Sequence, residues 1–118
     1  MGDSKKVLII DDEGDLLEMV TMRLNKAGHE VETALDGKQG LEKVSSFKPN
    51  VILLDVNMPE LNGWQVCQAL KENPETANIS VVILTATRDL KQAKEVKADR
   101  VVLKPFNFDE ILGVIDQS

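Results

Sequence analysis

The chain has 118 residues, of which 42% are hydrophobic and 29% are charged, a composition typical of one globular domain with one core. Its 20 acidic and 14 basic side chains give a net charge of −6 at pH 7, which disfavours direct binding to nucleic acid or to an anionic membrane. The single cysteine, Cys67, excludes an internal disulfide and a cysteine-based metal site.

The first half of the chain alternates strand and helix patterns. Residues 7–10 are a continuous apolar run that predicts a strand, and apolar residues then recur with a period of 3.6 from Leu16 to Ala27. That spacing predicts a helix, and Gly28 is placed to end it in the left-handed conformation. Residues 31–35 predict a second strand, and Leu41 and Val44 mark a shorter second helix.

The second half repeats the alternation. Residues 51–54 and 81–84 are continuous apolar runs, and residues 101–103 form a shorter one, so we expect three more strands. Helices are predicted around Val66 to Leu70, ending before Asn73, weakly around Ala93, and from near Asp109 to the end of the chain.

Five strands that alternate with five helices predict an α/β fold, a doubly wound (βα)5 sandwich around a parallel sheet. Continuous apolar strands indicate that helices cover both faces of the sheet. The common strand order for five strands is 2-1-3-4-5, which makes strands one and three neighbours at the topological switch point, where such folds bind ligands. No apolar run approaches the roughly 20 residues needed to cross a bilayer, so we expect a soluble, cytoplasmic protein.

The residues that directly follow the predicted strands carry charged or hydroxyl side chains. They are Asp11, Asp12 and Glu13 after the first strand, Asp55 after the third, Thr85 after the fourth and Lys104 after the fifth. Parallel strands end at the same edge of a sheet, so we expect these side chains to converge. Any one of them alone is more often a solvated loop residue, and the combination carries the functional interpretation.

Crowded carboxylates raise one another's pKa unless a cation lies between them. The available ligands are hard oxygens with no nearby histidine or cysteine, which favours magnesium. Lys104 and Thr85 are suited to bind the oxygens of a phosphoryl group. Asp55, on the central strand, is the predicted nucleophile that accepts it.

These residues resemble a known family. Asp11-Asp12, Asp55-Val56-Asn57-Met58-Pro59 with Gly63, Thr85-Ala86 and Lys104-Pro105-Phe106 are similar to the receiver domain of two-component response regulators, which has a flavodoxin-like fold. The resemblance spans essentially the whole chain. It implies that residues 1–118 are a single receiver domain, either a stand-alone regulator or the N-terminal domain of a longer one.

The resemblance also implies roles. Asp55 would be the phosphoacceptor, and Asp12, Asp55 and the backbone carbonyl of Asn57 would bind Mg2+ directly, with Asp11 acting largely through water. Thr85 and Lys104 would bind the phosphoryl oxygens, and the Lys104-Pro105 peptide bond would be cis. The donor would be a phosphohistidine on a sensor histidine kinase or a histidine phosphotransfer protein. The domain would catalyse only its own phosphorylation and dephosphorylation, and it would signal to a downstream protein or fused output domain through the face made by helix four, strand five and helix five.

The chain departs from the family pattern at three places. Val101 stands where the family has an aromatic switch residue, and the chain has no tyrosine. The segment between Thr85 and Lys104 is short by nearly one helical turn, so helix four should be truncated. Lys97 stands where glycine is common, which puts the usual turn after helix four in question. We therefore expect switching by reordering of the loop and helix four, without movement of an aromatic side chain.

Two other functions are compatible with part of the pattern. A magnesium-dependent phosphatase or hydrolase also uses a nucleophilic aspartate, but it typically carries an acidic residue two positions later, where this chain has Asn57. A receiver-like binding module that is not phosphorylated would keep the fold, yet the intact Asp55, Thr85 and Lys104 give no reason to prefer it.

Overall fold

Five strands and five helices alternate along the computed structural model, which describes residues 4–58 and 62–118. The strands are β1 (Lys6–Ile10), β2 (Glu30–Ala34), β3 (Val51–Asp55), β4 (Ser80–Thr85) and β5 (Arg100–Leu103). The helices are α1 (Gly14–Lys26), α2 (Gly37–Phe47), α3 (Gly63–Glu72), α4 (Lys91–Glu95) and α5 (Phe108–Asp116). Pro59, which belongs to the motif after β3, lies outside the described residues.

The sheet confirms the predicted topology. All neighbouring strands are parallel, and their order is β2-β1-β3-β4-β5. The register pairs Ile10 with Leu54 and Asp55 with Leu84, so the carboxyl ends of the inner strands β1, β3 and β4 lie close to one level. Asp55 and Thr85, expected just after their strands, are in fact the last residues of β3 and β4, because each is still paired with a neighbouring strand.

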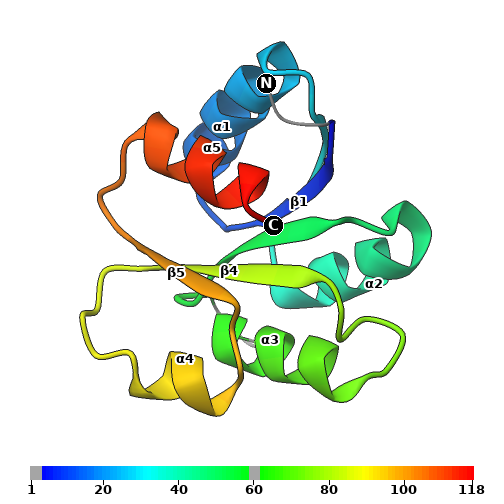
Figure 1. The fold of residues 1–118 in the computed structure, drawn as a ribbon, viewed down its shortest axis with the longest axis vertical. Coiled ribbons are helices and arrows are strands. Elements are labelled where there is room, and N and C mark those ends of the chain that lie inside the picture. The colour runs from blue at the N-terminus through cyan, green and yellow to red at the C-terminus, as the bar shows by residue number, and fades with distance from the viewer. Residues whose placement is uncertain (1–3, 59–61) are drawn as a thin grey trace.

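Helices cover both faces of the sheet, as the continuous apolar strands indicated (Figure 1). On one face α1 and α5 pack with Leu24 and Ile111 against Val7, Ile9 and other strand residues. On the other face α2 and α3 pack against alternate strand residues such as Leu8 and Ile52. Burying each such side chain completely contributes roughly 1.5–3 kcal/mol, so this sandwich is the main source of stability.

The helix ends follow from local sequence. Gly28 has φ of 95°, and its neighbour His29 donates its backbone N–H to the carbonyl of Leu24, which closes α1 with the expected left-handed motif. Asn62 and Asn107 begin α3 and α5 in capping boxes. The longest of these helices, α1, has 13 residues, and no helix among residues 4–58 and 62–118 is long and apolar enough to cross a membrane.

Helix α4 is truncated, as predicted, and spans only Lys91–Glu95. The turn after it is nevertheless retained. Lys97 takes φ of 61°, and the backbone N–H of Ala98 donates to the carbonyl of Ala93. The lysine therefore adopts the left-handed conformation that glycine would adopt without steric cost.

Candidate functional site

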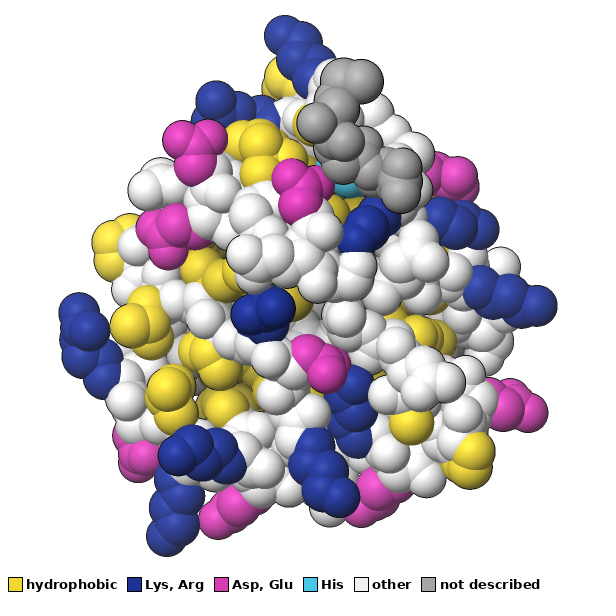
Figure 2. Space-filling model, viewed as in Figure 1, with side chains coloured by type: hydrophobic (Ala, Val, Ile, Leu, Met, Phe, Trp, Pro, Cys, Tyr) yellow, Lys and Arg dark blue, Asp and Glu magenta, His cyan; other side chains and the backbone are white. Residues whose placement is uncertain are grey.

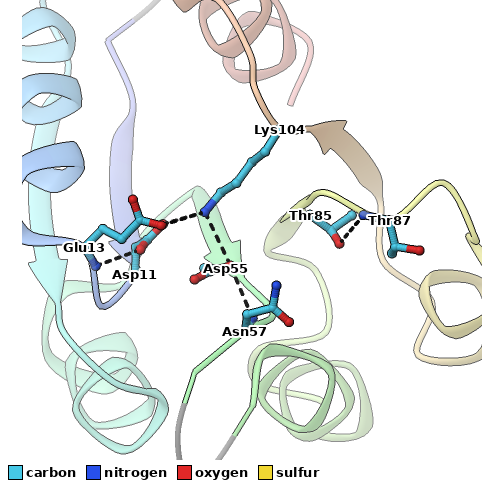
Figure 3. Close-up of polar contacts among 7 residues, drawn as sticks. All are labelled: Asp11, Glu13, Asp55, Asn57, Thr85, Thr87 and Lys104. Atoms are coloured by element: carbon cyan, nitrogen blue, oxygen red, sulfur yellow. Dashed lines mark hydrogen bonds and ion pairs between the residues drawn. The ribbon is translucent and has the colours of Figure 1, made fainter.

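Four polar side chains from four different strands meet at the carboxyl edge of the sheet (Figure 3). Asp11 follows β1, Asp55 ends β3, Thr85 ends β4, and Lys104 follows β5. Asp11, Asp55 and Thr85 are almost completely buried, with exposed fractions of 0%, 2% and 2%. The backbone N–H of Lys104 donates to the carbonyl of Thr85 at 2.8 Å, which ties the end of β5 to the end of β4.

The Lys104 ammonium lies among three carboxylates. Its Nζ is 3.4 Å from Oδ2 of Asp11, 3.5 Å from Oδ1 of Asp55 and 3.6 Å from Oε1 of Glu13. These distances exceed the roughly 2.7–2.9 Å of a tight charge-assisted hydrogen bond, so the ammonium is shared and not committed to one partner. The Lys104-Pro105 peptide bond is cis, as the resemblance implied.

Burial is the main influence on the charged groups. It raises the pKa of Asp11 and of Asp55, although a backbone N–H from Glu13 or Asn57 lowers each in part. Repulsion from a neighbouring aspartate, the cause expected from sequence, adds a smaller increase. Burial lowers the pKa of Lys104, but attraction to Asp11, Asp55 and Glu13 outweighs it and leaves this pKa raised. The site therefore favours additional positive charge.

The carboxylates fit a divalent cation. Oxygen atoms of Asp11, Asp12 and Asp55 lie within 4.8 Å of one another, and Asp12 is exposed. Two of these carboxylates are buried and have a raised pKa, and the third lies beside them. Their mutual repulsion is unfavourable, and a bound hard cation would reduce it. Asn57 lies next to them, since its backbone N–H donates to Oδ1 of Asp55 at 3.2 Å. The residues present are therefore suited to hold magnesium.

Thr85 lies on the side of Asp55 opposite to Asp11, on the neighbouring strand (Figure 3). Its Oγ1 accepts a hydrogen bond from the backbone N–H of Thr87 at 3.2 Å, and within the described residues it makes no hydrogen bond to Asp55 or Lys104. Lys104 thus contacts Asp11 and Asp55 directly, whereas the Thr85 side chain lies beside these three residues without bonding to them.

Glu13 contacts Lys104, although the sequence pattern assigns it no role beyond a place at the edge of the sheet. Its carboxylate points at the Lys104 ammonium (Figure 3). The available signal was the uninterrupted acidic run Asp11-Asp12-Glu13, but no spacing rule indicates that the third residue faces a lysine far along the chain.

Gly63 holds the end of β3 in place. A Cβ atom on this residue would lie 2.3 Å from the backbone oxygen of Asp55 and 2.6 Å from Cα of Val56. Any larger side chain would therefore push α3 away from the strand that carries Asp55. The glycine in the motif is explained by this close approach.

The chain is similar to known proteins in sequence and in fold. A family described as the response regulator receiver domain matches residues 7–116. The chain is 36% identical to the DNA-binding dual master transcriptional regulator RpaA of Synechocystis sp. over 92% of its own length and 46% of that protein. It is 34% identical to protein PilG of Pseudomonas aeruginosa, over 97% of this chain and 87% of PilG.

A solved structure agrees with the sequence matches. The chemotaxis protein CheY4 of Vibrio cholerae superposes with a TM-score of 0.91 at 32% identity, covering 98% of both chains. The present chain therefore spans almost all of some relatives and about half the length of others.

Proposed function

Because this chain belongs to the response regulator receiver family and is a receiver domain of two-component signalling, we propose that Asp55 accepts the phosphoryl group. The donor is the phosphohistidine of a sensor histidine kinase or histidine phosphotransfer protein. The observation that carries this proposal is the almost fully buried Asp55 carboxylate, 3.5 Å from the Lys104 ammonium and among the carboxylates of Asp11 and Asp12.

The chemistry is a direct transfer. An oxygen of Asp55 attacks the phosphorus, an O–P bond forms, and the P–N bond to the donor imidazole breaks with its electron pair returning to nitrogen. Lys104 neutralises charge on the transferred group, and Thr85 donates its hydroxyl to it. A carboxylate needs no general base to become nucleophilic. The domain then acts only on itself, through its own phosphorylation and dephosphorylation.

Asp11, Asp12, Asp55 and the backbone carbonyl of Asn57 are the residues that would hold magnesium. When bound, magnesium supplies positive charge that stabilises the phosphoryl group during transfer. Asp11 and Asp12 contribute by holding their carboxylates beside Asp55, and Lys104 contributes a second positive charge, 3.4 Å from Asp11 and 3.5 Å from Asp55.

The signal leaves through the face formed by α4, β5 and α5. Val101 on β5 carries no aromatic ring, and α4 is short, so we propose that phosphorylation reorders the loop after Thr85 together with α4. Lys91, Lys94 and Lys97 are exposed on this part of the molecule, and Figure 2 shows Lys and Arg side chains spread over the surface with Asp and Glu side chains between them. Spectra of Val101 and α4 that do not change on phosphorylation would exclude this mechanism.

Residues 1–118 act as one receiver domain that contacts a downstream protein or an output domain. RpaA is named a DNA-binding regulator, and this chain spans 46% of it. With a net charge of −6, the domain binds proteins and not nucleic acid directly. We place this signalling in the cytoplasm.

Intact mass after incubation with magnesium and acetyl phosphate tests the proposal. We expect a phosphoryl adduct on the wild-type chain that is absent in Asp55→Asn and absent when magnesium is chelated. Asp15→Asn, which neutralises an exposed aspartate on α1, should still form the adduct. A folded wild-type chain that binds magnesium without forming an adduct would favour the binding module that is not phosphorylated.

The hydrolase alternative is not favoured. Asn57 stands where such an enzyme would need an acidic residue, and its backbone N–H is bonded to Asp55. Sustained turnover of a phosphate monoester by the wild-type chain, lost in Asp55→Asn, would revive that alternative.

A further inference from the structure

We propose that Glu13 is a positioning residue that competes for the Lys104 ammonium and so slows phosphorylation of Asp55. This inference rests on the function proposed above. The Nζ atom of Lys104 lies 3.4, 3.5 and 3.6 Å from carboxylate oxygens of Asp11, Asp55 and Glu13, respectively. Asp11 and Asp55 are buried within the site, whereas 63% of the Glu13 side chain is exposed. Glu13 is therefore the one of the three that can be neutralised without leaving a buried group unpaired.

The start of α1 supports a role beyond helix formation. Glu13 is the N-cap residue of α1, and its side chain makes no capping hydrogen bond. By contrast, the N-cap residues of α2, α3 and α5 are Asp36, Asn62 and Asn107, and each accepts a hydrogen bond from the helix backbone. Aspartate and asparagine are strong N-cap residues, and glutamate is not among the preferred ones. The chain thus places at this position a side chain that caps α1 poorly and reaches Lys104.

The pairing has a direct consequence for the transfer. Lys104 must turn toward the phosphoryl group on Asp55. The ion pair with Glu13 stabilises the orientation of the ammonium in which it does not contact that group. The Glu13 carboxylate also adds negative charge beside an incoming dianion. Both effects act against phosphorylation, so removing the charge should accelerate it.

The experiment measures the rate of phosphorylation by acetyl phosphate at saturating magnesium, so that differences in metal affinity do not contribute. The variants are Glu13→Gln, Glu13→Asn and the charge-matched control Glu18→Gln, whose side chain is exposed on α1. We expect Glu13→Gln and Glu13→Asn to react about two- to fivefold faster than Glu18→Gln, the range typical of one partly exposed ion pair. High salt should narrow the difference because it screens the contact.

Thermal unfolding distinguishes an effect of Glu13 on the position of Lys104 from an effect on the stability of α1. Asparagine should cap α1 and raise the Tm, whereas glutamine should not, yet both variants should accelerate the reaction. If only the variant with the higher Tm is faster, the effect is structural and the inference is wrong. If Glu13→Gln fails to fold, Glu13→Ala, which also removes the charge without providing a cap for α1, takes its place.

Failure of this inference is distinct from failure of the proposed function. A wild-type chain that acquires no phosphoryl group contradicts the proposed function, and the inference falls with it. A wild-type chain that is phosphorylated, with Glu13→Gln equal to or slower than Glu18→Gln, overturns only the competing role of Glu13.

Discussion

The ammonium nitrogen of Lys104 lies 3.5 Å from Oδ1 of Asp55, although the two residues belong to strands that are not neighbours in the sheet. Lys104 reaches across the end of β4 to do so. The contact places one positive charge beside buried carboxylates whose pKa values are raised by burial. The carboxylates of the site therefore outnumber its positive charges when magnesium is not bound.

In the absence of metal, the contribution of Asp11 and Asp55 to the free energy of unfolding should fall as the pH rises. The pKa values of Asp11 and Asp55 in the folded chain lie above their ordinary value of 3.8. The folded chain therefore binds more protons than the unfolded chain, and the stability this provides is complete below pH 3.8 and lost as the pH rises through the folded pKa values. Urea unfolding in a chelator should show that the free energy of unfolding of the double variant Asp11→Asn/Asp55→Asn rises relative to that of the wild type as the pH increases above 3.8. A constant difference would contradict the prediction.

Asp55→Asn should stabilise the chain at pH 7 in the absence of metal. Asparagine keeps the size of the side chain but removes a buried charge, and burial raises the pKa of Asp55, so we expect the free energy of unfolding to increase. The exposed Asp12→Asn is the matched control and should gain less. With magnesium present, the wild type should be more stable than Asp55→Asn, because magnesium binds the folded wild type and stabilises it by mass action. A less stable Asp55→Asn in chelator would show that the pair with Lys104 outweighs burial.

Gly63→Ala should destabilise the chain by roughly 1–3 kcal/mol, because its Cβ would overlap backbone atoms at the end of β3. It should also slow phosphorylation, since the displaced backbone belongs to Asp55 and Val56. Gly113→Ala in α5 is the control, because nothing lies within 4 Å of the added Cβ. That variant should gain about 0.5–1 kcal/mol from helix propensity. Chemical denaturation measures the change in the free energy of unfolding for both variants. Equal changes in the two variants would contradict the prediction.

Lys97→Gly should stabilise the chain by about 1 kcal/mol, because Lys97 takes φ of 61° and glycine adopts that conformation without steric cost. Lys94→Gly removes the same side chain inside α4 and should lower stability by about 1 kcal/mol. The two variants lose the same charge, so differential scanning calorimetry isolates the backbone effect. A destabilised Lys97→Gly would indicate that the lysine side chain has a role of its own.

Lys71→Met should destabilise the junction between α3 and β4. The Lys71 ammonium donates to the carbonyls of Ala77 and Ile79 at 3.1 and 2.8 Å and lies 2.6 Å from Oδ2 of Asp99. Because the Asp99 side chain is 43% exposed, most of the loss should come from the two carbonyls, and we expect roughly 1–3 kcal/mol. The exposed Lys91→Met should change stability little. Urea unfolding curves that coincide for the two variants would contradict this assignment.

Most of the fold could be predicted because it depends on local pattern. Continuous apolar runs such as residues 51–54 bury both faces of a strand and so require a layer of helices on each side, and Gly28 ends α1 as its position indicates. The turn after α4 was less predictable. Lys97 has no intrinsic preference for a left-handed conformation, and it adopts one because β5 must begin at Arg100 beside β4.

The sequence by itself determined which side chains stand at the ends of the strands, because the end of each apolar run sets where each strand stops. It thereby identified Asp11, Asp55, Thr85 and Lys104 as neighbours at one edge of the sheet. Only the tertiary structure decided which of them touch. Glu13 faces Lys104 while Thr85 hydrogen-bonds to Thr87. Such contacts depend on side-chain rotamers, on the register between strands and on where each helix begins, and these are set by the packing of the whole domain.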